Sequence, residues 1–211
     1  MPEQFDQAFW DQRYRSHPTA LWSGQPNDHL VNETVGLVPG SALDVGCGEG
    51  ADAIWLAERG WSVTAVDLSI VALQRAAARA DQVGAEVAAR IEWVHEDLTI
   101  WDPGLARFEL VSAQYMHFPS IPRRALFERL AAAVAPGGSL LIVAHHPSDL
   151  QTTMQRPHLP DWFFTGDDIV ASLYTQQWTV ITNAAPERTG TDPEGNTLTI
   201  HDTVLRARRC K

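Results

Sequence analysis

Apolar and polar residues alternate along this chain in a pattern that predicts strands and helices in turn. Short apolar runs of the kind that form buried strands occupy residues 41–45, 62–66, 91–95, 109–113 and 139–144. The segments between them carry apolar residues at helical spacing, and one face of the helix predicted after Ser69 would present Ile70, Leu73, Ala77, Ala80 and Val83. Strands that alternate with helices are typical of an α/β fold with a mostly parallel sheet covered on both faces.

Turn and cap residues mark the ends of several predicted elements. Ser69 is a suitable N-cap for a helix reaching Val83, and Gly60 is placed to close a helix over 51–59. The run Pro136-Gly137-Gly138 ends the helix that Pro122 begins. Two final strands, near 177–183 and 197–207, flank the turn-rich TGTDPEGN and predict an antiparallel hairpin.

Two predicted helices, over residues 5–16 and near 28–36, precede the first strand and suggest an N-terminal helical lid. We expect one domain over 1–211, because the chain shows no linker or repeat. Within it, 1–40 would form the lid, 41–144 a ligand-binding core, and 145–211 a substrate loop with the closing strands.

A glycine loop follows the first predicted strand and gives the strongest indication of chemistry. It reads LDVGCGEGADA, with Asp44 two residues before Gly46, and with Gly48 and Gly50 following. Glycines let a backbone turn sharply and approach a ligand closely, and the helix after them directs free N–H groups at the same place. Asp67 ends the next predicted strand, where a carboxylate can accept hydrogen bonds from ribose hydroxyls. The pattern predicts a nucleoside site.

The identity of the nucleoside depends on the acidic residues. Gly46, Gly48 and Ala51 fit the NAD fingerprint that ends in alanine, so an NAD-dependent oxidoreductase is one interpretation. A carboxylate at Asp44 would repel a pyrophosphate but suits a cationic ammonium or sulfonium. After the third predicted strand, Asp97-Leu98 offers an acceptor for an adenine amino group and an apolar cover for its ring. These features favour a sulfonium nucleoside.

Together, these motifs resemble those of the class I S-adenosylmethionine-dependent methyltransferases, in order and at suitable spacing from Ser41 to Ala144. The segments FWDQRYR and LWSGQPN are similar to the entry segment of small bacterial members, the tellurite-resistance and thiopurine types. The resemblance implies a Rossmann-like, doubly wound, mostly parallel seven-stranded sheet with a C-terminal antiparallel hairpin. It also implies S-adenosylmethionine as the cofactor and S-adenosylhomocysteine as the product.

The resemblance assigns a cofactor role to each motif. The methionine portion would lie over Asp44, Gly46, Gly48 and Gly50. Asp67 would hold the ribose with Leu68 against the adenine, while Asp97 and Leu98 would bind the adenine edge. Gln114 is expected near the sulfonium, and Arg13 is a candidate partner for the cofactor's carboxylate, with a surface arginine as the alternative.

Substrate residues are expected after the fourth and fifth predicted strands, at the carboxyl ends where ligands bind in such sheets. Tyr115, His117, His145 and His146 lie there, and Trp22 is a further candidate from the lid. A histidine among His117, His145 and His146 would act as a general base for a thiol, phenol or heterocyclic nitrogen. Each of these histidines has a structural alternative, a hydrogen bond to backbone. A metal site built from His145, His146, His158 and Asp149 is disfavoured because its spacing matches no common site.

Composition restricts the partners. A net charge of −10 without a compensating basic stripe disfavours a nucleic-acid substrate. Ser112-Ala113-Gln114-Tyr115 also lacks the Asn/Asp-Pro-Pro-Tyr-like tetrad of methyltransferases that act on DNA bases or protein glutamine. No apolar run is long enough for a membrane, and the first residues lack the layout of a signal peptide. Two cysteines fit a reduced, cytoplasmic protein.

We therefore expect an enzyme that methylates a small molecule by in-line displacement at O, S or N, as a monomer or homodimer. The alternative from another class is a non-catalytic protein that binds S-adenosylmethionine as a sensor or a partner subunit. Intact acidic residues at 44, 67 and 97 do not separate catalysis from sensing.

Overall fold

The computed structural model describes residues 5–156, 159–173 and 177–211. They divide into two compact units, which we describe in turn. One unit runs to Asp102 and includes Phe108–Ser112, and the other comprises Pro103–Arg107 and the chain from Ala113. The single-domain organisation stays a prediction.

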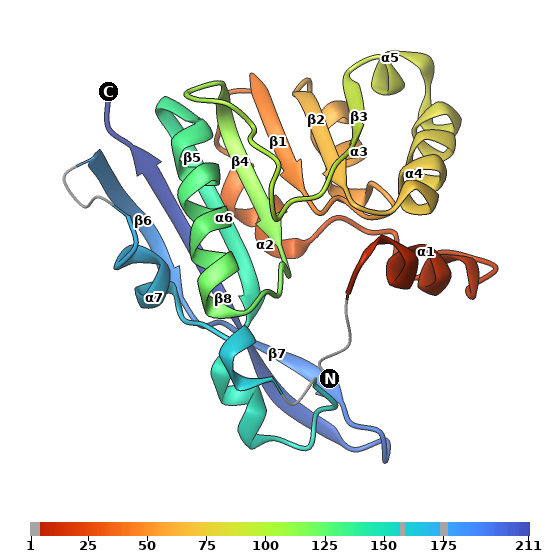
Figure 1. Ribbon diagram of the computed structural model, residues 1–211, viewed down its shortest axis with the longest axis vertical. Coiled ribbons are helices and arrows are strands. Elements are labelled where there is room, and N and C mark those ends of the chain that lie inside the picture. Colours follow the sequence, from red (N-terminus) through yellow and green to blue (C-terminus); the bar gives the residue numbers. More distant parts are fainter. Residues whose placement is uncertain (1–4, 157–158, 174–176) are drawn as a thin grey trace. The chain divides into compact units, whose positions relative to one another are not determined.

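The first unit contains three parallel strands and most of a fourth. Strand β1 pairs with β2, and β2 pairs with β3, in parallel register with Asp44 opposite Ala65 and Asp67 opposite His95. Its strand order is β3-β2-β1-β4 (Figure 1). The strands are β1 (Ser41–Val45), β2 (Ser62–Asp67), β3 (Ile91–His95) and β4 (Phe108–Gln114). The helices are α1 (Gln7–Arg15), α2 (Asp28–Thr34), α3 (Ala51–Glu58), α4 (Ile70–Val83) and α5 (Ala85–Ala88).

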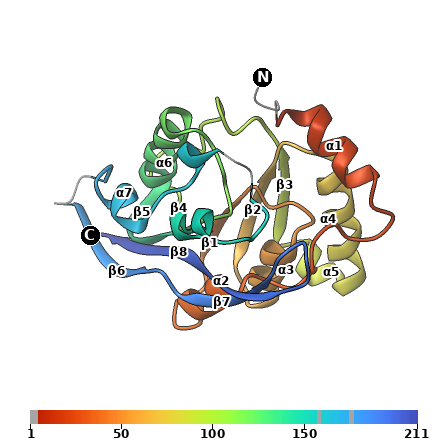
Figure 2. The ribbon, with the colours of Figure 1, turned by 90° about the horizontal axis from the view of Figure 1, so that it is seen from below.

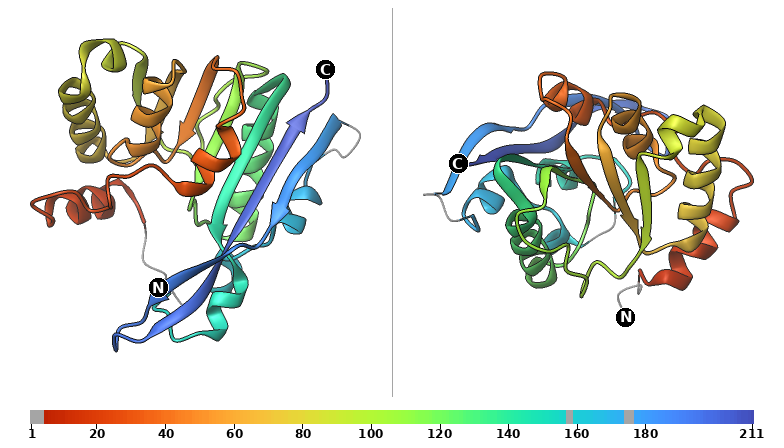
Figure 3. Two further views of the ribbon diagram at one scale, coloured as in Figure 1. Left: turned by 180° about the vertical axis from the view of Figure 1, so that it is seen from behind. Right: turned by 90° about the horizontal axis from the view of Figure 1, so that it is seen from above.

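The second unit is built on antiparallel strands. Strand β8 pairs with β5 on one side and β6 on the other, and its N-terminal half pairs with β7. Figure 2 shows β7 and β8 as a long ribbon, and Figure 3 shows β8 running beside β5. The strands are β5 (Val134–His145), β6 (Trp178–Ala184), β7 (Glu187–Thr191) and β8 (Thr197–Arg209). The helices are α6 (Ser120–Ala133), the 3₁₀ turns η1 (Pro147–Gln151) and η2 (Pro160–Trp162), and α7 (Gly166–Val170).

Each unit has an apolar core. Leu43 and Val45 in β1 and Leu56 in α3 are fully buried in the first unit. In the second, every residue from Leu140 to Ala144 is buried, as expected for a strand covered on both faces. Among the described residues, no helix combines the length and apolar character needed to cross a bilayer.

The predicted fold class, a mostly parallel α/β sheet with antiparallel C-terminal strands, is confirmed. Eight strands are described where the sequence predicts seven, because β7 forms within the segment that was expected to be only a turn. The predicted pairing of strands near 177–183 and 197–207 is present as β6 and β8.

One local prediction was wrong in part, and another was wrong. Leu73 and Ala80 of α4 are buried as predicted, and Ala72 and Ala76 complete the buried face, while Ile70 and Val83 are 40% and 44% exposed. The run Pro136-Gly138 does not separate helix from strand, because α6 ends at Ala133 and β5 already begins at Val134.

Candidate functional site

The loop between β1 and α3 has the conformation that its glycines permit. Gly46, Gly48 and Gly50 have φ values of 71°, 53° and 78°, in the left-handed region that L side chains avoid. The N–H groups of Gly46 and Cys47 both donate to the Val66 carbonyl of β2, at 2.8 and 3.0 Å. The loop therefore folds back over the end of the neighbouring strand.

Close packing adds a second requirement for glycine in this loop. A Cβ on Gly50 would lie 2.6 Å from the Trp93 ring and 2.8 Å from the Ala76 Cβ. A Cβ on Gly48 would lie 3.0 Å from the Tyr14 hydroxyl oxygen. Side chains from α1, α4 and β3 thus fix the loop from several directions.

Asp44 is a buried carboxylate beside this loop. Asp44 is 2% exposed, and its Oδ2 atom has no hydrogen-bond partner among the described residues. Burial raises the pKa of Asp44 well above its usual range, and the nearby charges of Asp52 and Asp67 raise it further. Burial also raises the pKa of Asp52 to about 6. A cationic ligand would relieve this concentration of negative charge, so the site suits an ammonium or sulfonium group.

Asp67 ends β2 and joins the glycine loop to α4. Its Oδ2 accepts from the Gly48 N–H at 2.8 Å, and its Oδ1 accepts from the Ser69 N–H at 2.7 Å. Burial raises its pKa, and these backbone hydrogen bonds act in the opposite direction. Each carboxylate oxygen retains a further lone pair, so Asp67 can accept from a ribose hydroxyl while it holds the loop.

The predicted adenine residues follow β2 and β3. Asp97 Oδ1 accepts from the N–H and the hydroxyl of Thr99, at 2.9 and 2.7 Å. Leu98 is buried and Leu68 is half-buried, and His95 Nε2 donates to the Leu68 carbonyl at 2.9 Å. His95 therefore has a structural contact.

Tyr14 of α1 is a buried aromatic residue that contacts the glycine loop, and the sequence did not indicate this role. Tyr14 is 3% exposed, its hydroxyl lies against Gly48, and the Trp22 Nε1–H donates to it at 3.2 Å. Burial raises the pKa of Tyr14, so the hydroxyl keeps its proton. Arg13 is exposed, with its guanidinium 5.9 Å from the Trp10 ring centroid. Trp22 is 51% exposed. The cofactor role of Arg13 and the substrate role of Trp22 stay predictions.

One carboxylate fixes the N-terminal strap, which we define as residues 17–22. Glu49 of the glycine loop accepts from the N–H groups of Leu21 and Trp22, at 2.8 and 3.4 Å. Its other oxygen lies 3.0 Å from Arg75 Nη1 on α4. Arg75 in turn donates to the carbonyls of His17 and Thr19, at 2.8 and 3.1 Å.

The two cysteines lie in different environments. Cys47 in the glycine loop is buried, and burial raises the pKa of its thiol well above the usual range. Cys210 is exposed.

In the second unit, three candidate substrate residues come together. The ring centroids of Tyr115 and His145 are 4.6 Å apart, and those of His117 and His145 are 4.9 Å apart. Tyr115 adopts φ 53°, an unusual conformation for a residue with a side chain, while its N–H donates to the Val143 carbonyl at 2.7 Å. Strained backbone of this kind is concentrated at functional sites. Gln114 is the last residue of β4 and is half-buried.

His146 lies beside this group but caps a 3₁₀ turn. Its Nδ1 accepts from the Ser148 N–H at 3.2 Å and lies 2.9 Å from the Ser148 hydroxyl. The structural alternative considered for this histidine is therefore present, and its catalytic role stays a prediction.

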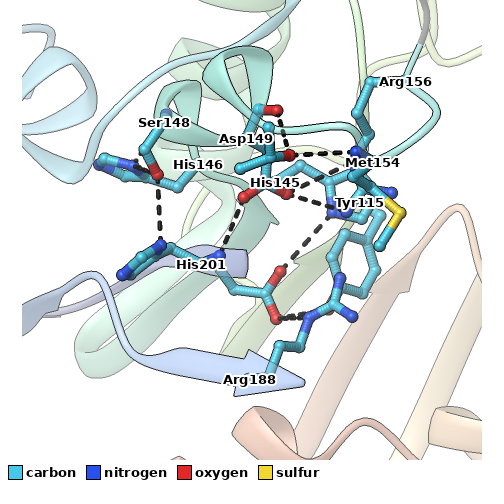
Figure 4. Close-up of polar contacts among 11 residues, drawn as sticks. Tyr115, His145, His146, Ser148, Asp149, Met154, Arg156, Arg188 and His201 are labelled. Carbon is cyan, nitrogen blue, oxygen red and sulfur yellow. Dashed lines mark hydrogen bonds and ion pairs between the residues drawn. The ribbon is translucent and has the colours of Figure 1, made fainter. Parts of the chain in front are cut away.

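The sequence analysis also missed two buried ion pairs near His145. Asp202 of β8 and Asp149 of η1 are almost fully buried. Asp202 pairs with Arg188 at 2.7 Å. Asp149 pairs with Arg156 at 2.9 Å (Figure 4). No local motif indicates these pairs, because their members are 7 and 14 positions apart and neither spacing corresponds to neighbouring positions on a helix face. Within the described part of the chain, no group of three or more metal-ligating side chains gathers. His158 lies outside the described residues.

Known proteins share this architecture. A model of the methyltransferase domain matches residues 42–138. An uncharacterized methyltransferase of Mycobacterium tuberculosis is 36% identical over 140 residues, which cover 66% of this chain and 66%, slightly under two thirds, of that relative. A solved structure that concerns the conversion of a disulfide bond into a thioacetal group during echinomycin biosynthesis has 25% identity and a TM-score of 0.71, with 97% of this chain and 91% of that chain covered. The glycopeptide N-methyltransferase MtfA, solved with S-adenosylmethionine, has 17% identity and a TM-score of 0.63, with 87% and 86% covered.

The fold and the glycine loop define an α/β protein with a nucleoside site. The domain match and the relatives make the assignment narrower: the chain belongs to the class I S-adenosylmethionine-dependent methyltransferase superfamily. The predicted family and cofactor are confirmed, and NAD is not supported.

Proposed function

We propose that this protein transfers a methyl group from S-adenosylmethionine to an oxygen, sulfur or nitrogen atom of a small molecule and releases S-adenosylhomocysteine. The observation that carries the proposal is the buried Asp44 beside a glycine loop, whose Oδ2 has no hydrogen-bond partner in the part of the chain that the structure describes. A buried carboxylate oxygen without a hydrogen bond lowers the stability of the fold. Binding of a cationic ligand explains why such a group is present at this site.

In this proposal the first unit holds the cofactor. Asp44 receives the ammonium group, and the loop glycines 46, 48 and 50 leave room for the methionine portion. Asp67 holds the ribose, with Leu68, Asp97 and Leu98 at the adenine. Tyr14 contributes a protonated hydroxyl beside Gly48, and Arg13 remains a candidate for the cofactor's carboxylate.

When bound, S-adenosylmethionine supplies a methyl group on a positively charged sulfur, already activated for displacement. The residues of the protein position the acceptor and exclude water, and positioning alone lowers a barrier by several kcal/mol. Tyr115, His117 and His145 provide the aromatic and imidazole surface of the second unit for a planar or soft acceptor, with His146 and Trp22 as further candidates. Gln114 is a candidate for the cofactor, near its sulfonium.

The acceptor class has support from two directions. The net charge of −10 disfavours a polyanionic substrate. The solved structure with 25% identity concerns the conversion of a disulfide bond into a thioacetal group, which favours including thiols among the acceptors tested. We therefore expect thiols, phenols and heterocyclic nitrogens to be the acceptors.

Calorimetric titration with S-adenosylhomocysteine, with NADH in parallel, tests the cofactor assignment. We expect micromolar binding of the first and none of the second. Asp44→Asn should weaken this binding about 10–100-fold, because a charge-assisted hydrogen bond is lost. Asp81→Asn, the same change at an exposed position of α4, is the matched control.

Two outcomes would contradict the proposal. Equal binding by Asp44→Asn and the unchanged protein would place the ammonium group elsewhere. Tight binding of S-adenosylhomocysteine without turnover of any acceptor would favour the sensor or partner-subunit alternative. Formation of S-adenosylhomocysteine in the presence of an acceptor distinguishes enzyme from sensor.

A further inference from the structure

Asp202 and His145 face each other across two antiparallel strands. They are register partners in the pairing of β5 with β8, so their side chains lie on the same face of the sheet. Asp202 is 0% exposed, and its Oδ1 lies 3.6 Å from His145 Nδ1. This separation is slightly longer than a hydrogen bond, as is common for catalytic pairs before a substrate binds.

The other oxygen of Asp202 is fixed by two donors. Arg188 Nε donates to Oδ2 at 2.7 Å, and the Tyr115 hydroxyl donates to the same atom at 3.0 Å. The carboxylate is therefore held in one orientation, with Oδ1 directed at the histidine. Asp202 and His145 thus form a carboxylate–imidazole pair in which Arg188 fixes the orientation of the carboxylate.

The His145 ring has little freedom to turn away. Tyr115 and His117 contact it with ring centroids at 4.6 and 4.9 Å. Its Nδ1 is buried and, within the described segments of the chain, has no hydrogen-bond partner closer than Asp202. With the Nδ1 proton directed at Asp202, Nε2 carries the lone pair, so this nitrogen is the one able to accept a proton.

The charges around His145 are balanced. Asp202 favours the charged imidazolium, while Arg188 and Arg156 disfavour it. Asp149 compensates Arg156 with a contact of 2.9 Å, and burial is the main cause that lowers the pKa of His145. The imidazole is thus neutral at pH 7 and available as a base.

The other two candidate histidines fit a base less well. Burial is the main cause that lowers the pKa of His117 to about 4, and the charge of His145 is the second. His117 is therefore too weak a base to take up a proton readily. His146 uses its Nδ1 to cap η1.

We propose that His145 is the general base for the acceptor, and that Asp202, Arg188 and Tyr115 are residues that position it. The inference rests on the proposed methyl transfer. The acceptor's O–H, S–H or N–H bond breaks, and its proton passes to His145 Nε2. The electron pair left on the acceptor forms the bond to the methyl carbon. The methyl–sulfur bond breaks with its pair on sulfur, and the proton on His145 is later released to water.

Histidine NMR tests the pair without any acceptor. We expect Asp202→Asn to lower the His145 pKa by about one unit or more, because an amide does not stabilise the imidazolium. Tyr115→Phe keeps the ring but removes one hydrogen-bond donor from Asp202. The carboxylate becomes more basic and stabilises the His145 imidazolium more strongly, so the His145 pKa should rise. Glu187→Gln is the matched control, since its carboxylate is 75% exposed one residue from Arg188. If Asp202→Asn does not fold, Tyr115→Phe alone decides, and a His145 titration that it leaves unchanged overturns the inference.

Turnover tests the base role. With thiol and phenol acceptors, Asp202→Asn should lower kcat about 100-fold and move the acidic limb of the pH profile to lower pH. With a tertiary amine or a thioether, which has no proton to lose, kcat should change little. An equal loss with both kinds of acceptor, or methylation of aprotic acceptors alone, overturns the inference.

Binding of S-adenosylhomocysteine separates this inference from the proposed function. Failure of the unchanged protein to bind it overturns the proposed function and the base role with it. Normal binding together with a His145 titration that does not respond to Asp202→Asn overturns only the inference.

Discussion

The two buried carboxylates at the glycine loop, Asp44 and Asp67, differ in how far hydrogen bonds compensate their burial. Asp44 and Asp67 are both buried within the first unit, and burial raises the pKa of each. Asp67 offsets this by accepting two backbone N–H groups, one on each oxygen. Asp44 has a backbone hydrogen bond with Ala53, but its Oδ2 has no partner among residues 5–156, 159–173 and 177–211. Asp67 therefore has a structural contribution in addition to its proposed contact with ribose, and Asp44 is more specialised for the ligand.

Replacement of Asp67 should separate these two contributions. Asp67→Ala should weaken S-adenosylhomocysteine binding by about 3 kcal/mol at most and leave the protein folded. Asp67→Asn, which keeps one acceptor oxygen, should fall between Asp67→Ala and the unchanged protein. Calorimetry measures both affinities, with circular dichroism as the check on folding. Unchanged affinity in Asp67→Ala would show that the ribose is bound elsewhere.

The sequence predicted the site where the requirement is local. The glycines at 46, 48 and 50 and the acidic residues at 44, 67 and 97 were found because sharp turns and strand ends limit which residues fit. Tyr14, Glu49 and Asp202 were not found, because each acquires its contacts from residues distant in sequence. Asp202, for example, contacts Tyr115, which precedes it by 87 positions.

At the scale of elements, the prediction of α4 shows how small residues mislead. Apolar periodicity pointed to Ile70 and Val83, yet the buried face consists of Ala72, Leu73, Ala76 and Ala80. Alanine is buried here because α4 approaches the glycine loop closely: a Cβ added to Gly50 would lie only 2.8 Å from the Ala76 Cβ. Strand β7 was missed for a related reason, since Thr and Gly in ERTGT read as turn residues until β8 pairs with them.

The N-terminal strap is held by the ion pair of Glu49 and Arg75, both of which bond to its backbone. We expect Glu49→Gln to increase hydrogen exchange at residues 17–22, because the amide has one acceptor oxygen and no ion pair with Arg75. The effect on the free energy of unfolding should be about 1–2 kcal/mol. Hydrogen exchange followed by mass spectrometry measures the opening of the strap.

Glu58→Gln on the exposed end of α3 is the control for this change. Equal exchange of the strap in both variants would mean that packing of Tyr14 and Trp22, rather than Glu49, holds the segment.

For the molecule as a whole, the buried acidic residues couple stability to pH. The pKa values of Asp44 and Asp52 are higher in the folded protein than in the unfolded chain, Asp52 at about 6. The folded state therefore binds these protons more tightly, and the stability they contribute is present below pH 3.8 and lost as pH rises through the folded pKa values.

Asp44→Asn should consequently be more stable than the unchanged protein at pH 8, by about 1–3 kcal/mol, with a smaller difference at pH 5. Thermal unfolding at both pH values measures this, and the difference between the two proteins removes the histidine contributions they share. Asp81→Asn should follow the unchanged protein at both pH values. A constant difference between pH 5 and pH 8 would show that Asp44 titrates normally.

The different exposure of the two thiols allows selective labelling of the protein at one cysteine. Cys47 is enclosed in the glycine loop with its thiol protonated, while Cys210 stands exposed near the end of the chain. A maleimide dye or a sensor surface will therefore couple at Cys210 and leave the loop unmodified. Ligand binding can then be followed on immobilised protein without removing either cysteine by mutation.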